Sequence, residues 1–213
     1  MEVLFSTAEV LKIGAEVLFG CLEVLFWGGK TQERSAVLFF SCYQHSKRLF
    51  MNPSYTVPAQ TRIGHVHLKV ADLERALEFY CGLLGFELIT RYGTQAAFIS
   101  AGGYHHHIGL NTWYSKGAPP APQRSAGLFH TAILYPTRRD LAMIFRRLLD
   151  ADYPLTGASD HGVSEALYLN DPDQNGVELY WDRPRELWPT KPDGSIEMYT
   201  IALDLEDLLG ELK

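Results

Sequence analysis

The stretch that decides the fold occupies residues 63–80 and reads Ile-Gly-His-Val-His-Leu-Lys-Val-Ala-Asp-Leu-Glu-Arg-Ala-Leu-Glu-Phe-Tyr. Residues 63–70 are predicted to form a strand. Asp72 then stands where it can cap a helix whose apolar residues recur at helical spacing, and Gly85 is placed to end that helix. Further strands are expected near residues 86–92, 95–101 and 105–112.

The same order of elements returns after a linker rich in Pro, Gly, Ser and Ala at residues 113–126. Residues 127–135 form a predicted strand, and Thr137 with Asp140 resembles a capping box at the start of a second helix. Additional strands are expected near residues 153–157, 163–170 and 176–182.

Fixed offsets relate the two halves. Adding 65 carries His65 to His130, and adding 69 carries Ile108 to Val177. The sequence therefore predicts an α+β fold in which two βαβββ modules, residues 63–112 and 127–182, pair around a metal-binding cavity. Together they make up a predicted domain at residues 60–185.

Composition narrows the class of protein. The chain has 213 residues, of which 46% are apolar and 21% charged, so collagen-like and wholly disordered chains are excluded. The net charge is −6 and no run of Lys and Arg appears, so no nucleic-acid partner is expected. The apolar stretches are too short to span a membrane. The 3 scattered cysteines indicate neither a disulfide framework nor a Cys-x-x-Cys site, so a reducing cytoplasm is the default expectation.

Both ends of the chain differ from the repeat. In residues 1–50 the tripeptide Glu-Val-Leu recurs every seven residues from Glu2 to Glu23, yet its consecutive apolar residues do not form a coiled-coil seam. We expect an upstream extension outside the fold, and the alternative is a real amphipathic or interfacial segment.

Leucines interleaved with acidic residues predict a short amphipathic helix in the C-terminal tail, residues 186–213, and the alternative is a frayed terminus.

The repeat points to a metal site. Both modules open with a histidine, His65 and His130, and the last predicted strand of the second module carries Glu178. Two imidazoles and one carboxylate form the facial arrangement that holds Fe(II) and leaves positions open. The first module has Gly109 where the second has Glu178, so we expect three protein ligands rather than four.

Because side chains alternate between the two faces of a strand, the other polar candidates can be assigned to the cavity face or to the opposite face. His107 shares the face of Gly109, whereas His106 is expected to face away, and Tyr168 is expected to face the cavity. His161 lies in the loop before the strand that carries Tyr168. The alternative for any one of these residues is an ordinary core, edge or exposed side chain, and His67 is expected to be structural or to line the pocket.

Three segments carry a resemblance to a known family. Residues 63–80 and 128–134 resemble the two module openings of the vicinal oxygen chelate superfamily, and residues 171–180 resemble its closing strand with the metal glutamate. Residues 160–169, Asp-His-Gly-Val-Ser-Glu-Ala-Leu-Tyr-Leu, are most similar to extradiol dioxygenases of the catechol 2,3-dioxygenase type. Many of those enzymes carry four modules, whereas this sequence has two, and Gln174 stands where the family usually has glycine.

The resemblance implies an enzyme. It implies Fe(II), or alternatively Mn(II), held by His65, His130 and Glu178, with a small aromatic diol and dioxygen as substrates. His107 is the implied acid or base, and His161 and Tyr168 are implied to hydrogen-bond the oxygens of the substrate. The alternatives are a glyoxalase-like lyase or isomerase and a non-catalytic small-molecule binding protein of the same fold. Because paired modules of that superfamily often associate, the resemblance also implies a homo-oligomer.

Overall fold

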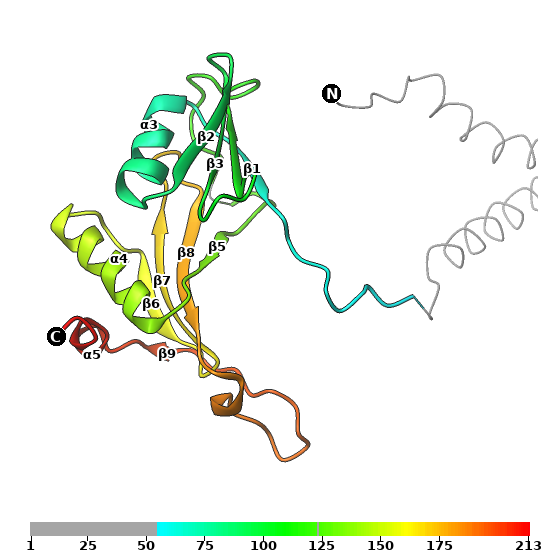
Figure 1. Cartoon of the computed structure of the whole chain (residues 1–213), viewed down its shortest axis with the longest axis vertical. Coiled ribbons are helices and arrows are strands. Elements are labelled where there is room, and N and C mark those ends of the chain that lie inside the picture. Colours follow the sequence, from blue (N-terminus) through cyan, green and yellow to red (C-terminus); the bar gives the residue numbers. More distant parts are fainter. Residues whose placement is uncertain (1–54, 123) are drawn as a thin grey trace, which may run out of the picture. The chain divides into compact units, whose positions relative to one another are not determined.

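The computed structural model describes residues 55–122 and 124–213 (Figure 1). The chain divides into two compact units, Met1–Thr61 and Arg62–Lys213. The helices and strands described below all belong to the second unit. The predicted extension at residues 1–50 lies outside the described residues.

The first module follows the predicted order. It contains β1 (Val66–Lys69), α3 (Leu73–Leu77), a π-helical segment η1 (Glu78–Leu83), β2 (Glu87–Tyr92), β3 (Ala96–Ser100) and β4 (Ile108–Asn111). The strands form one sheet in the order β1-β4-β3-β2, with β1 parallel to β4. The side chain of Asp72 accepts hydrogen bonds from the backbone N–H groups of Glu74 and Arg75, so the predicted helix cap is confirmed. Gly85 follows the helix at φ +88°, a conformation that favours glycine.

The second module repeats this order. It contains β5 (Thr131–Leu134), α4 (Arg138–Asp150), β6 (Gly157–Asp160), β7 (Ser164–Asn170) and β8 (Gly176–Asp182). A 3₁₀ turn η2 (Arg185–Leu187), β9 (Ile201–Ala202) and α5 (Leu205–Gly210) follow. The sheet order is β5-β8-β7-β6-β9, so its first four strands repeat the topology of the first sheet. The predicted α+β fold of two βαβββ modules is confirmed, as is the capping box of Thr137 and Asp140.

One predicted strand is misplaced. The strand expected near residues 153–157 begins only at Gly157. Pro154 lies in the segment before it and has no N–H group to donate to a neighbouring strand. The segment is still joined to β7, because the Tyr153 hydroxyl donates to the carbonyl oxygen of Asn170 and the backbone N–H of Thr156 donates to the carbonyl oxygen of Tyr168, both at 2.7 Å.

The apolar faces of both modules belong to one continuous core, and α3 and α4 lie on the same side of the sheets in Figure 1. An aromatic contact and a buried hydrogen bond join the modules. The ring of Phe79 packs 5.2 Å from the ring of Tyr153, and the Tyr80 hydroxyl donates to the Asp171 carboxylate at 3.0 Å. These contacts hold the two modules together on the side of the sheets that the helices cover.

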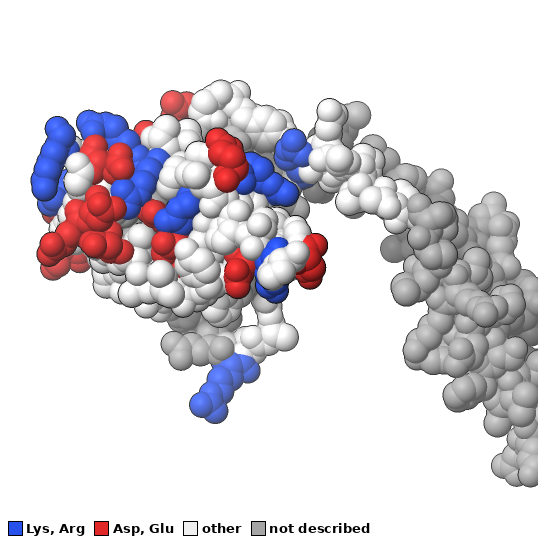
Figure 2. Space-filling model, turned by 90° about the horizontal axis from the view of Figure 1, so that it is seen from below, with Lys and Arg blue, Asp and Glu red and all other residues white. Residues whose placement is uncertain are grey.

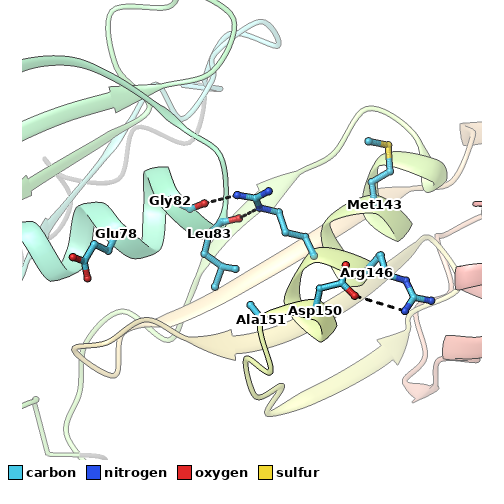
Figure 3. Close-up of a pocket in the computed structure, with 8 residues that line it drawn as sticks. Glu78, Gly82, Leu83, Met143, Arg146, Asp150 and Ala151 are labelled. Carbon is cyan, nitrogen blue, oxygen red and sulfur yellow. Dashed lines mark hydrogen bonds and ion pairs between the residues drawn. The ribbon is translucent and has the colours of Figure 1, made fainter.

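A shallow depression marks the outer edge of this contact (Figure 3). It lies between η1 and α4, where the Arg147 guanidinium donates to the carbonyl oxygens of Gly82 and Leu83. Its side chains are otherwise those of a solvated helix pair, including the weak ion pair of Arg146 with Asp150 at 3.9 Å. We therefore interpret this depression as part of the junction between the two modules. No helix among the described residues is both long and apolar enough to cross a membrane.

The turn that precedes β8 is organised by Asp171, whose side chain accepts hydrogen bonds from the backbone N–H groups of Asp173 and Asn175. Gln174 occupies this turn at φ +65°. An amino acid with a Cβ atom is strained in that region of φ, because the Cβ approaches the following carbonyl oxygen. The turn thus keeps the backbone shape of a glycine turn with glutamine in the strained position.

We predict that Gln174→Gly stabilises the protein by about 1 kcal/mol, because glycine removes this strain. Urea denaturation of the variant and the unchanged chain measures the difference. Gln95→Gly is the matched control, since Gln95 lies in a turn but does not itself have a positive φ. It should lower stability by a similar amount through the backbone entropy of glycine. An unchanged or lower midpoint for Gln174→Gly would contradict the prediction.

Candidate active site

Glu178 lies on β8, the strand between β5 and β7. It is opposite Ala132 of β5 and opposite Tyr168 of β7. Its neighbours Val177 and Leu179 are buried in the core. Because side chains alternate along a strand, Glu178 and Tyr168 project from the other face of the sheet.

The Glu178 carboxylate is held by two side chains. One oxygen, Oε2, lies 2.8 Å from Nε2 of His130, which immediately precedes β5. The other, Oε1, accepts a hydrogen bond from the Tyr168 hydroxyl at 3.1 Å. The carboxylate is 12% exposed, so these contacts are partly shielded from water. The histidine and the glutamate that the repeat singled out therefore meet in one place.

His161 extends this arrangement. It stands in the turn between β6 and β7, and its Nε2 lies 2.7 Å from the Tyr168 hydroxyl. Four of the six predicted site residues are thereby linked in one series of contacts, from His130 through Glu178 and Tyr168 to His161. Burial, together with the negative charge of Glu178 and the hydrogen bond to it, raises the pKa of Tyr168 to about 12. The phenol is neutral at physiological pH and is available as a hydrogen-bond donor.

The chemistry of His130 and Glu178 suits a divalent metal. A neutral imidazole and a carboxylate are both ligands for Fe(II) and Mn(II), and here their donor atoms already converge. Nδ1 of His130 is buried and has no hydrogen-bond partner among the described residues. The described residues contain no group of three or more His, Cys, Asp or Glu side chains arranged to hold a metal ion. Whether His65 joins this pair as a third ligand stays a prediction.

His65 and His107 lie in the first module. Both line a pocket that also contains the Thr131–Leu134 strand of the second module. Nδ1 of His107 lies 2.9 Å from the Ser100 hydroxyl and accepts from the backbone N–H of Ala101 at 3.3 Å. Since Nδ1 accepts, the neutral ring carries its proton on Nε2, which is then available to donate.

His106 differs from the expectation that it faces away. Its ring centroid lies 4.4 Å from that of His65 and 5.1 Å from that of Phe98. Strict alternation fails here because β4 begins only at Ile108, so His106 belongs to the preceding loop. Burial and the neighbouring His65 lower the pKa of His106. Sequence reasoning therefore overlooked a third imidazole beside the predicted site residues of this module.

The equivalence of Gly109 and Glu178 is visible in the strand register. In the first sheet His67 pairs with Gly109, and in the second Ala132 pairs with Glu178. A Cβ atom added to Gly109 would lie 2.9 Å from the His67 ring. The first module thus has a large side chain where the second has alanine, and glycine where the second has glutamate. His67 lies on this face, with its ring centroid 5.5 Å from that of Trp113.

We predict that Gly109→Ala destabilises the protein by about 1–3 kcal/mol, because the new methyl group meets the His67 ring. His67→Ala combined with Gly109→Ala should recover most of that loss, since the small side chain removes the clash. Thermal unfolding of the two single variants and the double variant measures the coupling. Gly127→Ala is the control, because no atom lies within 4 Å of its Cβ position. Simple additivity of the two changes would contradict the proposed contact.

Comparison with known proteins agrees with this architecture. Residues 62–179 match the model of the Glyoxalase/Bleomycin resistance protein/Dioxygenase superfamily, and the chain belongs to that superfamily. A crystal structure of a glyoxalase/dioxygenase from Nostoc punctiforme shares the fold, with a TM-score of 0.51 over 62% of this chain and 98% of that chain at 17% identity.

Two curated relatives are similar in sequence. The chain is 40% identical over 157 residues to the catechol-2,3-dioxygenase of Bacillus subtilis (strain 168), covering 73% of this chain and 54% of that protein. It is 32% identical over 122 residues to biphenyl-2,3-diol 1,2-dioxygenase 3 of Rhodococcus globerulus, covering 57% of this chain and 63% of that protein. The chain therefore spans between half and two thirds of the length of these relatives.

Proposed function

We propose that this protein is a metal-dependent extradiol dioxygenase that opens the ring of a catechol-type aromatic diol with dioxygen. The observation that carries the proposal is the series of contacts from His130 through Glu178 and Tyr168 to His161. It joins two metal-type donors to two hydrogen-bonding groups on one sheet face. The similarity to dioxygenases of catechol and biphenyl-2,3-diol supports the same substrate class.

His130 and Glu178 would hold the metal, with His65 of the first module as the third ligand. Fe(II) is the proposed ion, and Mn(II) suits the same donors. When bound, such an ion supplies a positive charge that favours the deprotonated diol, together with redox chemistry toward dioxygen. Gly109 brings no fourth donor, which leaves room for the substrates. Both oxygen atoms of dioxygen enter the product, a ring-opened semialdehyde of the hydroxymuconic type.

The remaining residues move or hold protons. Nε2–H of His107 is the proposed acid, because its Nδ1 is already occupied as an acceptor by the backbone N–H of Ala101. Tyr168 stays protonated, so its single O–H group can donate either to Glu178 or to a diol or product oxygen. His161, whose Nε2 contacts the Tyr168 hydroxyl, orients that donor.

We predict that His130→Ala and Glu178→Ala abolish tight binding of Fe(II) and Mn(II), and that His65→Ala does so as well. Metal analysis after gel filtration and calorimetric titration measure the stoichiometry and affinity, with circular dichroism to verify the fold. His67→Ala is the matched control and should keep the metal, because His67 lies two residues after the proposed ligand His65 but is not itself one. Full metal content in the Glu178 variant would refute the site.

A second prediction separates catalysis from metal binding. His107→Phe should retain metal and diol binding but lose ring cleavage by about 10²–10⁴-fold, the usual contribution of a general acid or base. Oxygen uptake per bound metal, with catechol as substrate, measures the loss independently of stability. His105→Phe is the control, since His105 is exposed in the same loop. A normal rate per metal in His107→Phe would exclude the acid role. Metal binding by the unchanged chain without turnover of any catechol would favour the glyoxalase-like or binding alternatives.

A further inference from the structure

The C-terminal tail returns to the sheet beside His161. Strand β9 pairs antiparallel with β6, with Ile201 opposite Asp160 and Ala202 opposite Ser159. The backbone N–H of Tyr199 donates to the carbonyl oxygen of His161 at 3.3 Å. The two residues before β9 are thereby carried to the far side of the His161 ring from Tyr168.

Both nitrogens of the His161 imidazole have partners. Nε2 faces the Tyr168 hydroxyl, while Nδ1 lies 3.0 Å from the carbonyl oxygen of Tyr199 and 3.1 Å from the hydroxyl of Thr200. A carbonyl oxygen only accepts hydrogen bonds, so the contact with Tyr199 requires a proton on Nδ1. The Thr200 hydroxyl can accept from the same N–H group. The neutral ring then has an unprotonated Nε2 that can accept from the Tyr168 hydroxyl, so the single phenol proton goes either to His161 or to Glu178.

Two sets of contacts hold the tail on either side of Thr200. On one side, the Tyr199 ring and Pro189 pack against Gly162, where an added Cβ atom would lie 2.6 Å from the tyrosine ring. Gly162 has φ +77°, so both the backbone shape and the close approach require glycine there. The tail is therefore packed directly onto the turn that carries His161.

On the other side, α5 is bound to α4 through Arg138. The guanidinium of Arg138, 18% exposed, forms ion pairs with Asp207 at 2.7 Å and Glu211 at 2.9 Å, and also with the buried Glu165 of β7 at 2.8 Å. Figure 2 shows acidic and basic side chains intermixed on the side of the unit where Figure 1 shows α4 and α5. The ion pairs connect α5, α4 and β7, the strand that carries Tyr168.

We propose that Thr200, together with the backbone carbonyl of Tyr199, positions His161 by holding its imidazole in the tautomer that carries the proton on Nδ1. The tail residues touch neither the proposed metal ligands nor Tyr168 in the contacts described, so their role is to orient the histidine. Any consequence for turnover rests on the proposed function, but the tautomer itself does not.

The test compares Thr200→Val, which removes the hydroxyl, with Thr200→Ser, which keeps it. Thr200 is exposed, so neither change should prevent folding. The readout is the ¹⁵N NMR spectrum of the histidine side chains in the full chain at a pH of about 9, above the ordinary range of imidazole titration. His161→Gln identifies the His161 signals. Thr190→Val makes the same chemical change elsewhere in the tail and serves as the control.

We expect the unchanged chain to show the Nδ1–H tautomer of His161. Thr200→Val should lower the ratio of that tautomer to the Nε2–H tautomer by about fivefold, the equivalent of one hydrogen bond. Thr200→Ser and Thr190→Val should leave the ratio unchanged. An equal ratio in Thr200→Val and the unchanged chain, or an equal loss in Thr190→Val, would overturn the proposal. Because the readout needs neither metal nor diol, it decides the positioning role even if ring cleavage is absent.

Discussion

A single buried carboxylate, that of Asp171, supports both halves of the structure. It is 1% exposed and accepts hydrogen bonds from Tyr80 of the first module and from two backbone N–H groups of its own turn. An unpaired charge in such a place is costly, so the tyrosine and the turn must both be in position before the carboxylate is satisfied. The turn that Asp171 organises leads directly into β8, and the register of β8 against β7 places Glu178 opposite Tyr168. The packing of the modules and the geometry of the candidate site therefore share one interaction.

Much of this architecture could be predicted from local pattern. The helix caps at Asp72 and Thr137 depend on residues within three positions of each other, and the structure confirms both. The repeat offsets predicted that Gly109 and Glu178 are equivalent, and the strand registers agree. Whether the six predicted site residues act together remains a prediction. The structure brings four of them into one series of contacts and leaves His65 and His107 in the other module.

What could not be predicted depends on irregular backbone or on long-range contact. His106 lies in a loop, where the alternation of a strand gives no guidance, and its ring packs on His65. The strand β6 begins only at Gly157, after a segment that contains Pro154, and its partner strand is separated from it in sequence. Thr200 precedes the amphipathic pattern of the tail and lies in a stretch without periodicity, so no signal in the sequence pointed to its contact with His161.

The pairing of His67 with Gly109 has a consequence for how the two modules could diverge. Each ladder pair holds one small and one large residue, but the order is reversed between the modules. A carboxylate at position 109 would enter the space of the imidazole, so residue 67 must become small first. The order of substitutions is therefore constrained, and the effect of one change depends on the other already being present. A symmetric protein with a carboxylate in both modules can therefore arise from this one if residue 67 changes before residue 109. The reverse order passes through a variant in which the two side chains clash.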